Sequence, residues 1–96
     1  FEVESTLVRH DAVLEAAVIG IENEDGLVRA KAFVVLKDPA AAGPALAETL
    51  QAFVKARLAP HKYPREVEFV TELPKTATGK IQRFRLRERE RTRRHG

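Results

Sequence analysis

The spacing of hydrophobic residues changes along the chain and predicts a different element in each segment. Residues 2–9 carry apolar side chains four positions apart, which is typical of a short helix with one buried face. Residues 14–21 are mostly Val, Ile and Ala and predict a buried strand. Residues 27–37 begin with alternating polar and apolar positions and end in an apolar run, which predicts a second strand. The acidic cluster at 22–26 ends in glycine and predicts the turn of an antiparallel hairpin.

The second half of the chain predicts one more strand between two helices. An Ala/Pro/Gly linker at 37–44 precedes a predicted helix at 45–58. The apolar stripe of this helix consists of Leu46, Leu50, Phe53, Val54 and Leu58. Pro60 ends it, because a proline ring does not fit in a helix interior. Residues 67–70 predict a third strand, and a final helix is expected from Ile81 onward.

This order of elements predicts an α+β fold. The expected sheet is small and three-stranded, an antiparallel hairpin plus a third strand, and it is flanked by helices. The 96 residues are 44% hydrophobic and 32% charged, which suits one globular domain with one modest core. No apolar run reaches the roughly 20 residues of a membrane span, so we expect no membrane partner.

Cysteine is absent, which excludes disulfides, thiolate metal sites and cysteine nucleophiles. This absence fits a reducing compartment, and we expect a cytoplasmic protein. The chain opens Phe1-Glu2-Val3-Glu4, without Met or a signal peptide. We therefore expect it to be an internal or C-terminal piece of a larger protein.

Positive charge is concentrated at the end of the chain. Residues 81–96 hold seven Arg and two Glu, a net charge of +5, whereas residues 1–80 have a net charge of −2. Such a tail can attract nucleic acid or another polyanion. No aromatic residue follows Phe84, so the stacking platforms of single-strand binders are missing. We therefore expect a solvated, fraying helix with Glu–Arg neighbours along it, and no nucleic acid partner.

The residue types that carry hydrolysis or bind metals are scattered. Ser5 is the one serine and has no nearby His and acid in sequence, so a hydrolytic triad is not expected. The histidines lie in unrelated segments: His10, His61 and His95. The acids of the hairpin turn are expected to be solvated: Glu22, Glu24 and Asp25. No spacing of these residues predicts a metal site.

The segment 74–80, Pro-Lys-Thr-Ala-Thr-Gly-Lys, is similar to part of the phosphate-binding loop G-x-x-x-x-G-K-[ST]. Pro74 replaces the first glycine and Ile81 replaces the hydroxyl residue that holds magnesium, so the motif is incomplete. What remains is a mobile loop of two threonines and a glycine that presents Lys80, a compact charge suited to an oxyanion or phosphate. Taken alone, this segment favours an ordinary surface lysine.

The longer segment 73–83, Leu-Pro-Lys-Thr-Ala-Thr-Gly-Lys-Ile-Gln-Arg, resembles the C-terminal signature of the adenylate-forming superfamily. That family includes acyl- and aryl-CoA synthetases, adenylation domains of peptide synthetases, and luciferases. Further segments resemble family motifs in the same order: 1–4, 10–20, 31–36 and 58–65. The resemblance spans the chain and is closest to benzoate–CoA ligases and related aryl-CoA ligases. Asp11 stands where proline is common, and His61 where an aromatic residue is common.

The resemblance implies that residues 1–96 form the C-terminal lid domain of an ATP-dependent carboxylic acid–CoA ligase, with a basic C-terminal helix at 81–96. In this family an acid and ATP, with Mg²⁺, give an acyl-adenylate, and the acyl group then passes to coenzyme A. Lys80 matches the adenylation lysine, and Gly79 and Thr78 complete its nucleotide-side loop. The isolated domain is expected to be inactive.

The resemblance also implies that the lid turns a different face to coenzyme A in the second step. Lys62 and Arg65, on a proline-stiffened loop, are candidates to bind the phosphates of coenzyme A. Exposed surface cations are an equally good interpretation of these two residues.

The implied partners are the larger N-terminal domain of the same protein and a small carboxylic acid, benzoate or a related aryl acid. Pro74-x-x-x-x-Gly79-Lys80 also resembles the site at which protein acetyltransferases modify acyl-CoA synthetases, and acetylation would remove the charge of Lys80. Two alternatives remain open. One is a lid that acts with a carrier protein, and the other is a non-catalytic basic binding module.

Overall fold

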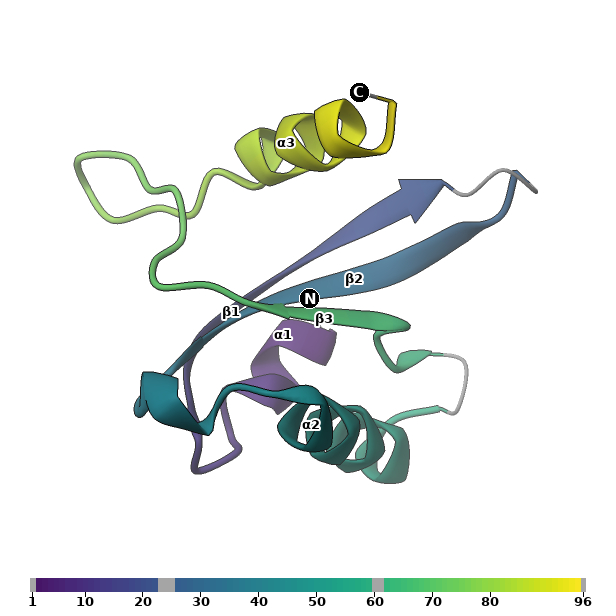
Figure 1. Ribbon diagram of the computed structural model, residues 1–96, viewed down its shortest axis with the longest axis vertical. Helices are drawn as coiled ribbons and strands as arrows, with labels where there is room; N and C mark the ends of the chain where they lie inside the picture. Colours follow the sequence, from purple (N-terminus) through teal and green to yellow (C-terminus); the bar gives the residue numbers. More distant parts are fainter. Residues whose placement is uncertain (1, 23–25, 60–61, 96) are drawn as a thin grey trace.

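In the part of the chain that the structure describes, residues 2–22, 26–59 and 62–95, three α-helices cover the two faces of a three-stranded sheet (Figure 1). The structure is a computed structural model. Its elements, in chain order, are α1 (Glu2–Leu7), β1 (Val13–Glu22), β2 (Val28–Leu36), the 3₁₀ turn η1 (Pro39–Ala41), α2 (Pro44–Arg57), β3 (Glu66–Phe69) and α3 (Arg83–His95). The strand order is β1-β2-β3, with β1 and β2 antiparallel and β3 parallel to β2. The predicted α+β class, a hairpin plus a third strand, is confirmed.

The parallel pairing of β2 and β3 depends on α2. Two parallel strands need a crossover connection, and α2 provides it by packing on one face of the sheet. Pro44 begins the helix, where a missing N–H costs nothing, and its residues Leu50 and Val54 are fully buried in the core. The helix ends at Arg57 with Leu58 extended. Pro60, the predicted terminator, lies outside the described residues.

The sheet separates two hydrophobic cores, which corrects the expectation of a single modest core. α1 and α2 cover one face, and α3 covers the other (Figure 1). The core on the α1/α2 side consists of Val3, Leu7, Val13, Ala16, Ala32, Val34, Leu36, Leu50 and Val54. The core on the α3 side consists of Ala17, Ile19, Ile21, Phe33, Val35, Leu73 and Leu86. Because β2 is the central strand and both its faces are buried, its end is continuously apolar rather than alternating.

The predicted linker and the predicted start of the last helix both differ from the structure. The linker at 37–44 contains η1, which Asp38 caps by accepting a hydrogen bond from the N–H of Ala40 at 3.1 Å. The last helix begins at Arg83 rather than at Ile81, because the backbone of Ile81 pairs with that of Lys75.

α3 corrects the expectation of a solvated, fraying tail. Leu86 is fully buried against β1 and β2, and the Glu90 side chain is only 5% exposed. Glu90 faces Lys31 of β2, whose side chain is 6% exposed, with Nζ 2.8 Å from Oε1 of the carboxylate. Lys31 also lies 3.0 Å from Glu68 of β3. Glu90 therefore attaches α3 to the sheet through Lys31, in addition to neutralising an arginine of its own helix.

Two arginines complete this ion-pair network, which we call the α3 latch: Lys31, Glu66, Glu68, Glu90, Arg93 and Arg94. Arg93 contacts Glu68 at 2.7 Å, and Arg94 contacts both Glu66 and Glu90, at 2.8 and 3.0 Å. The second carboxylate oxygen of Glu90 makes no hydrogen bond within the described residues and lies 3.7 Å from Arg93. Removing either charge of the Lys31–Glu90 pair would leave a buried charge with one ion-pair partner fewer: Lys31 would keep Glu68, and Glu90 would keep Arg94.

Acid is expected to weaken the fold through three carboxylates. Burial acts to raise the pKa of Glu90, but Lys31 and Arg94 outweigh it and hold that pKa below its ordinary 4.5. Glu68, beside Lys31 and Arg93, and Glu4, beside Arg83 and the Val18 N–H, also have lowered pKa values against the opposing effect of burial. A depressed folded-state pKa stabilises the fold above the unfolded value, and that stability is lost as the pH falls through the folded pKa.

Denaturant unfolding of the chain should therefore show a constant free energy near neutral pH and a steady decrease below about pH 4.5. Glu90→Gln removes one of these carboxylates, so the free energy of unfolding of this variant should depend less steeply on pH. An unfolding free energy that stays constant or rises on acidification would contradict this assignment.

Candidate functional site

The segment that carries Lys80 is an ordered turn rather than the mobile loop we expected. Lys75 and Ile81 form an isolated antiparallel bridge at its base. The N–H of Gln82 donates to the carbonyl of Pro74 at 2.8 Å, and the N–H of Thr76 donates to the carbonyl of Lys80 at 2.9 Å. We call residues 74–82 the Lys80 turn. It connects β3 to α3 and lies on the α3 side of the sheet, where Leu73 and Ile81 pack into the core.

The tip of this turn depends on glycine and threonine. Gly79 has φ +88°, a left-handed conformation that strains any residue with a Cβ. Its N–H donates to the carbonyl of Thr76 at 2.9 Å, which closes the turn. The hydroxyl of Thr76 accepts the N–H of Lys80 at 3.0 Å and lies 3.1 Å from the hydroxyl of Thr78. The predicted residues Thr78, Gly79 and Lys80 are thus brought together.

Lys80 itself is exposed and has no carboxylate partner among the described residues. Two nearby cations are neutralised, because Lys75 in the turn pairs with Glu15 of β1 and Arg83, just after the turn, pairs with Glu4 of α1. An unpaired ammonium on an ordered backbone is available for an anionic ligand, and it does not have to break an existing ion pair first.

The other two predicted site residues lie at the far side of the domain. Lys62 and Arg65 precede β3, at the opposite end of the sheet from the Lys80 turn (Figure 1). The Nζ of Lys62 lies 2.8 Å from Oε2 of Glu2, so its charge is neutralised within the domain. The guanidinium of Arg65 lies 5.0 Å from the centre of the Tyr63 ring. The structure therefore keeps the two predicted basic sites apart.

Lys55 is a basic residue of this second site that the sequence did not single out. Its Nζ lies 5.0 Å from the centre of the Tyr63 ring, so the ring has contacts with two cations. The loop is held in place by Gln51, whose side-chain amide donates to the carbonyls of Pro64 and Arg65 at 3.0 and 3.2 Å. The sequence showed Tyr63 among basic residues, but it did not indicate that Lys55, eight residues earlier on α2, would contact this ring.

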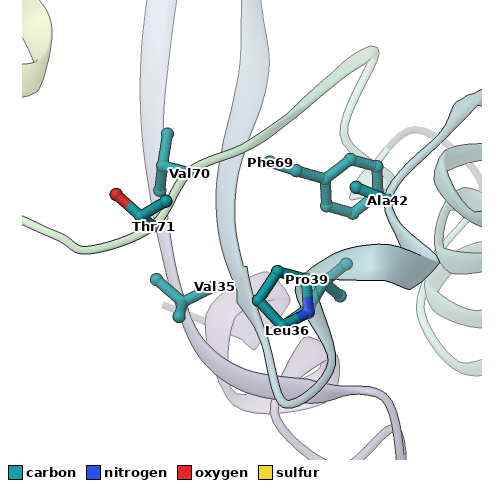
Figure 2. A pocket seen from close by; sticks show the side chains of 7 residues that line it. All are labelled: Val35, Leu36, Pro39, Ala42, Phe69, Val70 and Thr71. Atoms are coloured by element: carbon teal, nitrogen blue, oxygen red, sulfur yellow. The ribbon is translucent and has the colours of Figure 1, made fainter.

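The structure also contains an apolar cavity of about 240 Å³ where β2 and β3 end (Figure 2). Its lining residues are Val35, Leu36, Pro39, Ala42, Phe69, Val70 and Thr71. None of them is charged, and Thr71 supplies the one side-chain oxygen (Figure 2). This lining offers no cation to a phosphate and no ligand set to a metal.

Metal ligands do not gather elsewhere in the described ranges, where no group of three or more His, Asp or Glu side chains could hold an ion. The Nδ1 of His10 accepts the N–H of Ala12 at 3.1 Å, and its ring packs edge-on against Phe53 at 4.9 Å. His10 thus has a structural role. No described helix is both long enough and apolar enough to cross a membrane.

The chain matches a known family of small domains. Residues 2–80 match the model of the family described as the AMP-binding enzyme C-terminal domain, and the chain belongs to that family. The resemblance of the sequence to adenylate-forming enzymes is thereby confirmed.

Particular relatives can also be named. The chain is 65% identical over 86 residues to the benzoate–CoA ligase of Thauera aromatica, in an alignment that covers 90% of this chain and 16% of that protein. It is 48% identical over 89 residues to the 4-hydroxybenzoate–CoA/benzoate–CoA ligase of Rhodopseudomonas palustris, covering 92% of this chain and 16% of the relative. A solved benzoate CoA ligase from Burkholderia xenovorans LB400 is 67% identical with a TM-score of 0.84, covering 90% of this chain and 17% of that one. The chain therefore spans about a sixth of the length of these relatives.

Proposed function

We propose that this chain is the C-terminal lid of an ATP-dependent, AMP-forming acid–CoA ligase, and that Lys80 acts in the adenylation step. The observation that carries the proposal is the exposed ammonium of Lys80, which has no carboxylate partner among the described residues and sits on a turn closed by its own hydrogen bonds. Family membership supports the lid, and the ligases named above support the reaction class.

Adenylation brings two anions together. A carboxylate oxygen of the acid forms a bond to the α-phosphorus of ATP as the bond to pyrophosphate breaks. The ammonium of Lys80 would screen the repulsion between the reactants and stabilise the negative charge that builds up on the phosphoryl oxygens. Mg²⁺ accompanies ATP as part of the substrate, and the N-terminal domain supplies the acid pocket and most of the nucleotide site.

The acid is benzoate or a related aryl acid, because the names of all three similar proteins given above include benzoate–CoA ligase. In the second step the thiol sulfur of coenzyme A attacks the carbonyl carbon of the acyl-adenylate, and AMP leaves. Because the acyl group passes to coenzyme A, this proposal differs from that of a lid that acts with a carrier protein. Acetylation of Lys80 by a protein acetyltransferase would remove the charge that adenylation needs. The proposed location of the whole enzyme is the cytoplasm.

The surface around Tyr63 is our candidate for the contact with coenzyme A. Lys55 and Arg65 lie beside an aromatic ring at an ordered loop, which suits a ligand with phosphates and an adenine ring. Lys62 remains a candidate, but it would have to leave Glu2 to bind a phosphate. The distance of this surface from Lys80 fits a lid that presents one face in each half-reaction.

This part of the proposal is tested in the full-length ligase by Lys55→Ala and Arg65→Ala. Each change should raise the KM for coenzyme A about tenfold, because each removes one charge-assisted contact worth about 1.5 kcal/mol or more. Pyrophosphate release from acid and ATP should stay within about twofold of the unmodified enzyme. Lys37→Ala, which removes an exposed lysine from another part of the surface, is the matched control. Unchanged KM values in both variants would exclude this surface.

A further inference from the structure

One ion pair crosses the open edge of the sheet and ties the start of the chain to the end of the Lys80 turn. β1 is an edge strand, since the sheet order is β1-β2-β3. Glu4 belongs to α1, which packs on one face of the sheet, and Arg83 begins α3, which packs on the other. Their side chains meet beside β1, although 79 positions separate them in the sequence.

The contact between Arg83 and Glu4 is bidentate, and we call it the Glu4–Arg83 fork. Arg83 donates from Nε to Oε2 of Glu4 at 2.7 Å and from Nη2 to Oε1. The same Oε2 accepts the backbone N–H of Val18 at 2.7 Å, so the carboxylate is fixed to the edge strand itself. Its side chain is only 13% exposed, and that of Arg83 is 35% exposed. Burial acts to raise the pKa of Glu4, but Arg83 and the Val18 N–H hold it below 4.5, so Glu4 is charged at neutral pH.

The backbone segment between this fork and Lys80 is short. Only two residues lie between Arg83 and Lys80, and each is fixed in the turn. Ile81 pairs with Lys75 and packs into the core, and Gln82 donates its N–H to Pro74. An extended residue spans at most about 3.6 Å, so Lys80 cannot move far while Arg83 is held.

We infer that Arg83 and Glu4 are positioning residues for Lys80: their fork fixes the end of the turn against β1 and so fixes the direction from which the ammonium reaches the reactants. Neither residue has to touch a substrate. The inference rests on the proposed role of Lys80. Misplacing a catalytic group by about 1 Å can cost up to ~10²-fold in rate, so losing the fork should weaken the adenylation step specifically.

The test compares both half-reactions in the full-length ligase. The variants are Arg83→Ala, Glu4→Ala, their double, Arg83→Lys and Lys80→Ala. Pyrophosphate release from benzoate and ATP gives kcat and KM for adenylation, and preformed benzoyl-adenylate with coenzyme A gives the thioester step. Thermal unfolding of each variant is measured alongside. Arg93→Ala is the matched control, because it removes an α3 ion pair with Glu68, away from the turn.

Each alanine change at the fork should lower kcat for adenylation about tenfold or more, with the KM for ATP and the thioester step within about twofold. The double variant should be no slower than the worse single one, because both changes remove the same contact. Arg83→Lys should fall between, since one ammonium cannot form the fork. Arg93→Ala should leave both steps within about twofold.

Equal losses in both steps would show that the pair merely holds the domain together and would overturn the inference. So would full adenylation activity in Arg83→Ala while Lys80→Ala is inactive, a result that leaves the proposed function intact. Normal adenylation by Lys80→Ala would overturn the proposed function, and the positioning role would be lost with it.

Discussion

Replacing Lys80 by alanine in the full-length enzyme is expected to lower the rate of adenylation by about 10²- to 10³-fold, the usual cost of removing one positioned charge at a developing oxyanion. The effect should appear in kcat, because the ammonium acts mainly on charge that develops in the transition state. Pyrophosphate release under saturating benzoate and ATP measures it. The structure adds that folding should not suffer, because Lys80 is exposed and makes no ion pair among the described residues.

Lys80→Arg is the informative companion variant. It keeps the positive charge but replaces a compact ammonium by a larger planar group, so we expect only a partial recovery of adenylation. Recovery of the full rate by arginine would show that charge alone is sufficient at this position. A Lys80→Ala enzyme with a lowered melting temperature would contradict the view that this side chain has no structural role.

The second large effect concerns stability. Glu90→Ala should lower the free energy of unfolding of the 96-residue chain by about 3 kcal/mol, because Lys31 would keep a buried ammonium with one carboxylate partner in place of two. For a domain of this size that corresponds to a fall in melting temperature on the order of 10–20 °C. Thermal and denaturant unfolding measure both quantities.

Two further variants separate burial from charge. Glu66→Ala removes a more exposed carboxylate, 42% exposed, that also pairs with Arg94, and it should cost less than about 1 kcal/mol. Lys31→Leu combined with Glu90→Leu should cost less than Glu90→Ala, because no charge is left unpaired in the interior. If Glu90→Ala costs no more than Glu66→Ala, the buried part of the α3 latch does not hold the helix.

The local pattern of the sequence predicted the elements well but not what lies between them. The apolar run at the end of β2 correctly predicted a strand, and the structure explains the run by the burial of both faces of this central strand. The helix start at Arg83 was missed, because the pairing of Ile81 with Lys75 involves backbone groups that carry no sequence signal. The packing of α3 was missed because two buried residues, Leu86 and Glu90, are outnumbered by arginines.

For the candidate site too, the sequence indicated some features and not others. Lys80 could be singled out as a candidate only by resemblance, because a heptad of loop residues does not distinguish a catalytic lysine from a surface one. Coordinates were needed to find the ordered turn around it, with Gly79 at φ +88°, and to see that Lys80 has no carboxylate partner among the described residues. The Glu4–Arg83 fork joins the two ends of the chain, and no local pattern connects residues 79 positions apart.

Assays of both half-reactions in two variants test whether one lid serves the two half-reactions with two separate surfaces. Full-length Lys80→Ala and Arg65→Ala are each assayed for adenylation and, from preformed benzoyl-adenylate, for thioester formation with coenzyme A. We expect Lys80→Ala to lose the first step and keep the second, and Arg65→Ala to keep the first and need more coenzyme A for the second. Parallel losses in both steps for both variants would contradict this expectation.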